Sequence, residues 1–320
     1  MGKWRRRCLL GQRSPKENSN NFFSNEIVIL MSSLTLVIPC YNEAKSLIKL
    51  VPSLLEQSIK YGWKLIFVND GSSDGTLEIL KQFKEKHEFE IINYKRNKGY
   101  GAALKSGFKR SNTKFVISFD ADGQHKLDDV KDIFGLAIKD DCDLIIGTRR
   151  DKGISYRKIG KAIIKILARI LLKSKIKDLN SGLKLYKTEL AKKYMTICPD
   201  TMAFSEVITL VFVYFKHDII EYQIKVGSRR AGKSTITTYT AFDTLLEIIN
   251  IIMLFNPLRI FFPLFVIIAI PSVIWASTFV FLGKGLTTGS LFGLVFALLI
   301  LLLGLIAEQI SKLRKEKLTP

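Results

Sequence analysis

Short apolar runs alternate with amphipathic stretches between residues 34 and 148. The apolar runs predict five strands, at residues 34–39, 64–69, 89–94, 114–120 and 143–148. The stretches between them predict four helices, at residues 44–59, 76–86, 101–109 and 127–139. Strands that alternate with helices form parallel sheets, and buried parallel strands are apolar on both faces. We therefore predict an α/β domain with a mainly parallel sheet.

Two runs without any charged residue follow near the C-terminus, at residues 260–282 and 285–307. Each is about 23 residues long, which is enough to cross a hydrocarbon core of roughly 30 Å. Pro263 and Pro271 lie in the first run, but membrane helices tolerate proline better than soluble helices do. We therefore predict two transmembrane helices at residues 258–310 that form a hairpin, in preference to a hairpin buried inside a soluble protein.

Basic residues predict the orientation of this hairpin. The tail at residues 311–320 carries four of them and Arg259 precedes the first span, whereas the turn holds Lys284 alone. Positive residues stay on the cytoplasmic side of a membrane. We expect an integral membrane protein whose large domain, residues 34–238, is cytoplasmic and reaches the spans through a juxtamembrane helix at residues 239–257.

A basic stripe lies between the predicted sheet and the hairpin. Its five members recur at spacings of three and four residues, as on one side of a helix at residues 157–177: Lys158, Lys161, Lys165, Arg169 and Lys173. Like charges at this spacing repel one another, and an anionic surface would relieve the repulsion. The stripe indicates an interfacial helix lying on the bilayer; the alternative is a solvated face over a protein core.

The whole chain is basic, with a net charge of +20 over 320 residues. Such a charge favours anionic partners, either phosphates or an anionic membrane face. No aromatic-rich basic motif or zinc-finger spacing supports a nucleic-acid partner. The four cysteines lie far apart and form no C-x-x-C pair, which argues against a zinc site and a disulfide framework. Residues 1–33 are expected to be a disordered leader, with Met31 as a candidate natural start.

The strongest candidate for chemistry is Asp120-Ala121-Asp122, at the end of a predicted strand. Ligands bind at the carboxyl ends of the strands in sheets of this kind, and alternate carboxylates there can both reach one cation. Gln124 is placed to assist, and His125 is a weaker candidate ligand. A divalent ion shared between carboxylates and phosphate oxygens stabilises a departing nucleoside diphosphate.

Polar loops follow two other predicted strands. The first is Pro39-Cys40-Tyr41-Asn42-Glu43-Ala44, and the second, at residues 69–76, is rich in small, turn-forming residues. Asp70 and Asp74 are candidates to accept hydrogen bonds from a base or a ribose. Alternatively, Asp74 or Thr76 caps the next helix, and the two roles are compatible.

These three motifs, in this order, resemble those of family 2 glycosyltransferases. The segment Asp178-Leu179-Asn180-Ser181-Gly182-Leu183-Lys184 resembles the Asp-x-x-Ser-Gly-Phe-Arg segment of the dolichyl-phosphate mannose synthase and polyprenyl-phosphate glycosyltransferase branch, and the predicted hairpin is similar to that branch as well. The resemblance covers residues 34 to 310. It implies a nucleotide-diphospho-sugar transferase fold, which is the Rossmann-like GT-A fold.

The resemblance implies roles for individual residues. The nucleotide pocket would be lined by Pro39, Tyr41, Glu43, Asp70, Asp120 and Ala121. Magnesium or manganese would be held by Asp120, Asp122 and Gln124. The phosphates of donor and lipid would be contacted by Arg149, Ser181, Arg229, Lys233 and Ser234. The implied catalytic residues are Asp122, Asp178, Arg149 and Arg229; Asp178 would orient the acceptor or act as a weak base, with Glu206 behind it.

The sequence departs from the family pattern at two places. The family's Arg-x-x-Gly-x-Ser-Lys segment corresponds to residues 229–235, where Thr235 replaces the lysine and Lys233 is the nearest substitute. The family's Phe-Arg is Leu183-Lys184, and lysine lacks the bidentate fork of arginine. The Gln-x-x-Arg-Trp run of the processive synthases has no counterpart in the sequence, which favours transfer of a single sugar.

Residues 227–234 also match the phosphate-loop pattern G-x-x-x-x-G-K-[ST] letter for letter. That pattern belongs to a strand, a helix and a further acidic strand of a nucleotide triphosphatase. Too few residues follow before the first span to supply them. We interpret the segment as a phosphate clamp at the membrane surface.

The combined prediction is a metal-dependent, inverting transfer of one sugar from a GDP- or UDP-linked donor to a polyprenyl or dolichyl phosphate at the cytoplasmic membrane face. A second hypothesis is a catalytically inactive membrane scaffold with the same fold, and a third is an enzyme that uses another lipid acceptor. The intact acidic pair and the two arginines, Arg149 and Arg229, argue against the scaffold. Assembly into a homo-oligomer is compatible with the sequence.

Overall fold

The computed structural model describes residues 33–149, 176, 178–179, 181–224 and 253–316. These residues belong to two compact units, the second of which contains the described residues 253–316. Several predicted features lie outside the described residues: the leader up to residue 32, nearly all of the basic helix at residues 157–177, most of the juxtamembrane helix, and the loop with Arg229, Lys233 and Ser234.

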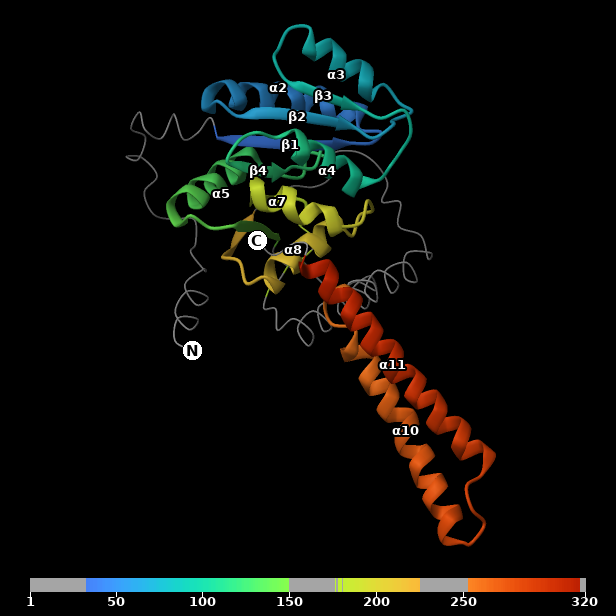
Figure 1. Cartoon of the computed structure of the whole chain (residues 1–320). Coiled ribbons are helices and arrows are strands. Elements are labelled where there is room, and N and C mark those ends of the chain that lie inside the picture. Colours follow the sequence, from blue (N-terminus) through green and yellow to red (C-terminus); the bar gives the residue numbers. More distant parts are fainter. Residues whose placement is uncertain (1–32, 150–175, 177, 180, 225–252, 317–320) are drawn as a thin grey trace. The chain divides into compact units, whose positions relative to one another are not determined.

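A seven-stranded sheet forms the centre of the first unit (Figure 1). Its strands are β1 (Leu34–Cys40), β2 (Lys64–Asn69), β3 (Glu90–Asn93), β4 (Phe115–Ser118), β5 (Leu144–Arg149), β6 (Lys184–Lys187) and β7 (Ile219–Ile224). They lie in the order β3-β2-β1-β4-β6-β5-β7. All neighbours are parallel except β6, which runs antiparallel to β4 and to β5.

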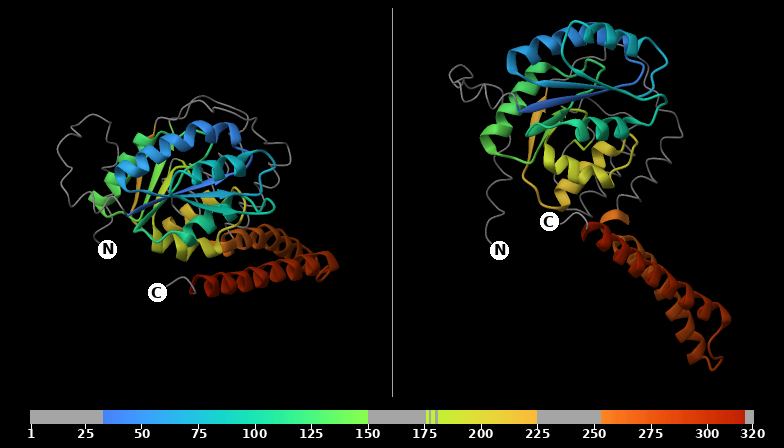
Figure 2. Two further views of the ribbon diagram at one scale, coloured as in Figure 1. Left: turned by 90° about the horizontal axis from the view of Figure 1, so that it is seen from above. Right: turned by 45° about the horizontal axis from the view of Figure 1, so that its top comes forward.

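Side chains alternate between the two faces of β1, and each face packs against its own helices. Leu34, Leu36 and Ile38 join a core with α2 (Ala44–Tyr61), α3 (Thr76–Lys84) and α5 (Leu127–Asp140). Val37 points to the opposite face, where a Cβ added at Gly107 would collide with it. That face is covered by α4 (Tyr100–Arg110), α7 (Thr188–Tyr194) and α8 (Phe204–Tyr214), with a short 3-10 helix, η1 (Met195–Ile197), between α7 and α8. Figure 2 shows the sheet between these two layers.

The sequence-based prediction of the first unit is confirmed for five strands and four helices, with ends that differ by a few residues. The mainly parallel sheet is also confirmed, with β6 as the exception. The sequence analysis placed no elements at β6, α7 or α8. β6 reads Lys-Leu-Tyr-Lys, so its lysines hide a strand in which Lys184, Leu185 and Tyr186 are buried.

The second unit is a hairpin of two long helices, α10 (Leu258–Phe281) and α11 (Thr288–Glu316). Both are long and apolar enough to cross a membrane, and their most apolar 18-residue windows have mean hydropathies of 2.3 and 2.8. Gly293 faces Ser272, and Gly304 faces the Phe261 side chain, so the two helices approach closely at these glycines. The second helix begins later than the predicted run at 285–307, and it extends past the end of that run because its last turns are helical although they carry charged residues.

Side chains from the end of α11 also fix the chain that enters α10. The Ser311 hydroxyl donates to the carbonyl of Leu254 at 2.6 Å, and Lys315 Nζ donates to the carbonyl of Phe255 at 2.9 Å. These carbonyls precede the first long helix, so their partners stabilise its entry.

Candidate functional site

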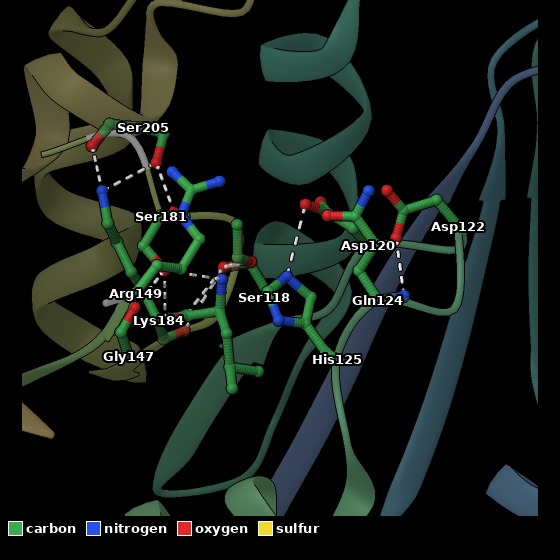
Figure 3. Close-up of polar contacts among 12 residues, drawn as sticks. Ser118, Asp120, Asp122, Gln124, His125, Gly147, Arg149, Ser181, Lys184 and Ser205 are labelled. Atoms are coloured by element: carbon green, nitrogen blue, oxygen red, sulfur yellow. Dashed lines mark hydrogen bonds and ion pairs between the residues drawn. The ribbon is translucent and has the colours of Figure 1, made fainter. Parts of the chain in front are cut away.

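The loop after β4 carries the predicted acidic pair. Asp120 and Asp122 follow the buried strand, and Gln124 and His125 complete the turn before α5. The Asp122 carboxylate accepts a hydrogen bond from the backbone N–H of Gln124 at 3.0 Å. In Figure 3 the polar ends of Asp120, Asp122 and Gln124 lie on the same side of this loop. The arrangement places three oxygen-bearing side chains together within five residues.

Asp120 is held by residues from two further parts of the chain. The Tyr100 hydroxyl, at the start of α4, donates to Asp120 Oδ1 at 2.9 Å, and His125 Nε2 lies 3.5 Å from Asp120 Oδ2. Burial alone would raise the pKa of Asp120, but the hydrogen bonds from His125 and Tyr100 and the charge of Arg149 lower it below its ordinary value of 3.8. The carboxylate is therefore ionised at neutral pH and remains 31% exposed.

The ligand types in this loop suit a hard divalent cation, but these side chains alone are too few to hold one. Carboxylate and amide oxygens are the ligands that Mg²⁺ and Mn²⁺ prefer. Within the described part of the chain, however, no group of three or more His, Cys, Asp or Glu side chains could hold a metal by itself. Magnesium in nucleotide sites is commonly bound by one or two carboxylates plus substrate phosphates, and Asp120 with Asp122 meets that requirement.

Arg149 and Asp178 form an ion pair beside the acidic loop. Arg149 closes β5, and its Nε and Nη2 donate to Asp178 Oδ2 and Oδ1 at 2.9 and 3.2 Å. Burial would raise the pKa of Asp178, but the hydrogen bonds and the charge of Arg149 lower it below 3.8. The hydrogen bond and charge of Asp178 raise the pKa of Arg149 most, and the charges of Asp120 and Asp122 raise it further. The pair and the acidic loop therefore share one electrostatic site.

Ser181 and Gly182 are hydrogen-bonded to the two strands that lead into this site. The Ser181 side chain is fully buried, and its hydroxyl donates to the carbonyl of Gly147 at 2.5 Å. The Ser118 hydroxyl donates to the carbonyl of Gly182 at 2.9 Å. In this arrangement the Ser181 hydroxyl ties the segment before β6 to β5, and its predicted contact with a phosphate stays a prediction.

Lys184 has no exposed surface, in contrast to a residue that contacts phosphate. Its Nζ donates to the carbonyls of Leu179 and Ser205, both at 2.6 Å, and to the hydroxyls of Ser205 and Thr209 at 2.7 and 2.8 Å. Burial lowers the pKa of Lys184 from 10.5 to about 7, against the opposing charges of Glu206 and Asp178. The Lys184 amine thus joins the segment at Leu179 to α8.

The predicted nucleotide loops are tied to one another. The backbone N–H of Ser73 donates to Asn42 Oδ1 at 2.8 Å, and that of Ala44 donates to Asp74 Oδ2 at 3.1 Å. Asp74 Oδ1 also accepts from the N–H of Thr76, the first residue of α3, at 3.0 Å, although the N-cap position itself is Gly75. Asn42 has a φ of 55°, in the left-handed region, where asparagine is tolerated.

Asp70 occupies the interior of these loops. It is 3% exposed, and its two oxygens accept the backbone N–H groups of Lys98 and Gly99 at 2.7 and 2.9 Å. Tyr41 by contrast is 51% exposed, and Glu43 accepts a hydrogen bond from the Ser46 hydroxyl at 2.7 Å. Pro39 is part-buried and Ala121 is buried. Asp70 therefore fixes the entry to α4, while Tyr41 presents an open aromatic face.

The sequence analysis missed one residue of the site, Tyr100, and named another, His125, only as a weaker candidate ligand. Tyr100 stands in no motif with Asp120, and only the packing of α4 against β1 and β2 brings the two together. His125 was given a minor role as a ligand, whereas its ring is buried against Phe119 at a centroid distance of 5.8 Å and contacts Asp120. In the sequence alone, nothing distinguishes Tyr100, which follows Gly99 at the start of a helix, from a tyrosine of the core.

Two family profiles match the chain. Residues 35–195 match Glycosyl transferase family 2, and residues 256–313 match the GtrB C-terminal hairpin. A dodecaprenyl-phosphate galacturonate synthase of Rhizobium johnstonii is 28% identical over 166 residues, which cover 50% of this chain and 49% of that protein. A dolichyl-phosphate beta-glucosyltransferase, ALG5A of Trichomonas vaginalis, is 32% identical over 178 residues, which cover 50% and 54%. The chain thus spans about half the length of these curated relatives.

Solved structures share the fold. A glucosyl-3-phosphoglycerate synthase from Mycobacterium tuberculosis superposes with a TM-score of 0.57 at 15% identity, covering 73% of this chain and 85% of that one. The same protein in complex with Mn²⁺, uridine-diphosphate and glucosyl-3-phosphoglycerate has a TM-score of 0.56 at 15% identity, covering 73% and 86%. At this identity the likeness concerns the fold alone.

Proposed function

Because this chain belongs to glycosyltransferase family 2, we propose that it transfers one sugar from a GDP- or UDP-linked donor to a polyprenyl or dolichyl phosphate. The observation that carries this proposal is the shared electrostatic site of Asp120, Asp122 and the Arg149–Asp178 pair at the carboxyl edge of the sheet. The curated relatives named above act, by their names, on dodecaprenyl or dolichyl phosphate. The apolar hairpin supports an acceptor that resides in a membrane.

The acidic loop would hold Mg²⁺ or Mn²⁺ through Asp120, Asp122 and Gln124. When bound, such an ion supplies positive charge to the diphosphate that leaves. Tyr100 and His125 keep the Asp120 carboxylate ionised and in place. The glucosyl-3-phosphoglycerate synthase that shares this fold was solved in complex with Mn²⁺ and uridine-diphosphate, which supports this assignment.

The acceptor is proposed to attack without a strong base. A phosphate monoester has a second pKa of about 6, so it is mostly dianionic at neutral pH. One of its oxygens would form a bond to C1 of the sugar while the bond between C1 and the diphosphate oxygen breaks, and the nucleoside diphosphate leaves with the electron pair. Attack opposite the leaving group inverts C1. Asp178 has a lowered pKa and is already bonded to Arg149, which suits it to orient groups more than to accept a proton.

Arg149 is proposed to contact phosphate, and so are Arg229, Lys233 and Ser234, which lie outside the described residues. Arginine presents two parallel N–H groups to an oxyanion, and Arg149 already uses this geometry with Asp178. We also propose that the catalytic unit faces the cytoplasm, because the basic residues gather at the two outer ends of the hairpin.

A product assay tests the proposal. The purified full chain in detergent is incubated with radiolabelled UDP- and GDP-sugars and a short polyprenyl phosphate, with and without Mn²⁺. We expect a lipid-extractable, labelled sugar phosphate with at least one donor, and none without the lipid phosphate. Binding of nucleotide without transfer to any lipid would instead support the inactive scaffold, and labelled product on diacylglycerol or a lipid-linked saccharide would support the third hypothesis.

A further inference from the structure

The carboxylate of Asp120 is contacted from three sides by groups that no sequence motif joins to one another. Tyr100 comes from α4, His125 from the loop after Asp120, and Gly182 from the segment before β6. We propose that Tyr100, His125 and Gly182 form a socket that fixes the Asp120 carboxylate in one orientation, so that Tyr100 is a positioning residue for cation binding. This Asp120 socket rests on the proposed function, since it assumes that Asp120 holds the cation.

Tyr100 is fixed before it reaches Asp120. It is the first residue of α4, and the two preceding backbone N–H groups, of Lys98 and Gly99, donate to Asp70. Gly99 has a φ of 103°, which favours glycine, and it lies against the carbonyl of Asp200. The N–H of Ala102 donates to that same carbonyl at 3.2 Å. Hydrogen bonds therefore fix the backbone before and after Tyr100, which holds its hydroxyl at Asp120 Oδ1.

His125 restrains the other oxygen. Its side chain is 4% exposed, and its Nε2 lies 3.5 Å from Asp120 Oδ2. The ring packs edge-on against Phe119, the residue before Asp120. Among the described residues its Nδ1 has no hydrogen-bond partner, so the ring is held by packing and by its contact with Asp120.

Gly182 provides the space that the carboxylate occupies. A Cβ at position 182 would overlap Asp120 Oδ2 and crowd Oδ1 at 2.9 Å. Gly182 is not in the left-handed region, so space, and not backbone conformation, requires glycine here. The Ser118 hydroxyl donates to the carbonyl of Gly182, which keeps this backbone against Asp120.

A carboxylate held in this way can still bind a cation. Each carboxylate oxygen accepts more than one contact, and the Asp120 side chain keeps 31% of its surface exposed. Partners that hydrogen-bond to a ligating carboxylate orient it, and their removal typically weakens metal binding by about 10-fold to 100-fold. The same range is expected when the Tyr100 hydroxyl is removed.

The first test is a Mn²⁺ titration followed by electron paramagnetic resonance, with the full chain in detergent and UDP or GDP present. Tyr100→Phe should weaken Mn²⁺ binding about 10-fold relative to wild type. Tyr94→Phe is the matched control, because the Tyr94 hydroxyl bonds to Ser106 and to the Ala102 carbonyl of α4 and not to Asp120. This variant should bind Mn²⁺ as tightly as wild type does. Asp120→Asn should abolish nucleotide-dependent binding.

These variants separate the possible failures. If wild type shows no nucleotide-dependent Mn²⁺ binding, the cation site of the proposed function is refuted and the socket with it. If Asp120→Asn abolishes binding while Tyr100→Phe binds as tightly as wild type, the socket alone is refuted.

A second variant tests the socket through its backbone. Gly182→Ala should weaken Mn²⁺ binding by at least as much as Tyr100→Phe, because the new Cβ displaces the carboxylate. Gly135→Ala is its control, since a Cβ there meets nothing within 4 Å. Circular dichroism confirms that each variant is folded before titration. A folded Gly182→Ala protein that binds Mn²⁺ as wild type does would contradict the socket, whatever the result for Tyr100.

Discussion

Arg149 and Asp178 are joined by two parallel hydrogen bonds, with Nε 2.9 Å from Oδ2 and Nη2 3.2 Å from Oδ1. The pair links the end of β5 to the segment that leads into β6. Because the guanidinium also senses the charges of Asp120 and Asp122, it balances a site that is otherwise acidic. A phosphate that enters this site would have to share Arg149 with Asp178, so the fork of the arginine matters as much as its charge.

Arg149→Lys should therefore lower kcat/KM for sugar transfer, although the positive charge is kept. Lysine cannot bond to a carboxylate and a phosphate through a planar fork. Removing a donor that stabilises developing charge costs roughly 100-fold to 1,000-fold, and we expect a loss of about 10-fold or more because one contact remains. Steady-state kinetics with the donor that gives product measure this effect.

Arg110→Lys is the control for this substitution. Arg110 also bonds to a carboxylate, that of Glu90, but both side chains are largely exposed. Its substitution should leave kcat/KM unchanged, since exposed ion pairs contribute little. Equal activity of Arg149→Lys and wild type would show that the fork has no role in transfer.

Lys184 predicts a pH dependence of stability. Its pKa is about 7 in the folded chain, below the ordinary 10.5, because the amine is buried. Between these values the unfolded chain binds a proton that the folded chain does not, so rising pH favours the folded state, by up to about 1.4 kcal/mol per pH unit. Below about pH 7 both states are protonated and the dependence disappears. The stability of wild type relative to Lys184→Met should rise from pH 7 to 9.5.

Thermal unfolding followed by circular dichroism measures this difference. Subtracting the curve of Lys184→Met removes the contribution of other titrating groups. Lys139→Met, at an exposed position of α5, should give a curve parallel to wild type. Parallel curves for Lys184→Met and wild type would mean that Lys184 titrates as an ordinary lysine and that burial does not shift its pKa.

The hairpin makes a separate prediction. A Cβ at Gly304 would lie 2.5 Å from Phe261 Cβ and 3.0 Å from its Cγ. Overpacking of this kind costs about 1–3 kcal/mol, so Gly304→Ala should lower the temperature at which the protein leaves its monodisperse peak in detergent. Gly289→Ala, where a Cβ meets nothing within 4 Å, should not. If the two variants melt together, the close approach of α10 and α11 at Gly304 is not present in solution.

The sequence specified much of this fold because its signals are local. Apolar runs gave β1 to β5, turn residues marked the loops, and two charge-free runs gave the hairpin. β6 was not predicted because it is only four residues long and has lysine at both ends, so it shows no alternation that distinguishes it from a loop. Lys184 could not be recognised as buried, since its acceptors lie on α8, 21 and 25 residues later.

The candidate site was predictable where one motif supplies it. Asp120, Asp122 and Gln124 stand within five residues, and the order of the motifs indicated the family. The pairing of Arg149 with Asp178 and of Tyr100 with Asp120 depends on tertiary packing across 29 and 20 residues. The sequence analysis named Arg149 and Asp178 separately, and it could not foresee that the Ser181 hydroxyl donates to the Gly147 carbonyl. The roles of these residues stay predictions.

The most direct measurement compares sugar transfer to polyprenyl phosphate by wild type, Asp120→Asn, Asp122→Asn and Asp128→Asn in the presence of Mn²⁺. Asp128 is an exposed acidic residue at the start of α5 and serves as the control. We expect Asp128→Asn to match wild type, and each of the other two to lose about 100-fold or more in rate while remaining folded by circular dichroism. Full transfer by folded Asp120→Asn and Asp122→Asn proteins would contradict the central claim that this acidic pair holds the cation on which transfer depends.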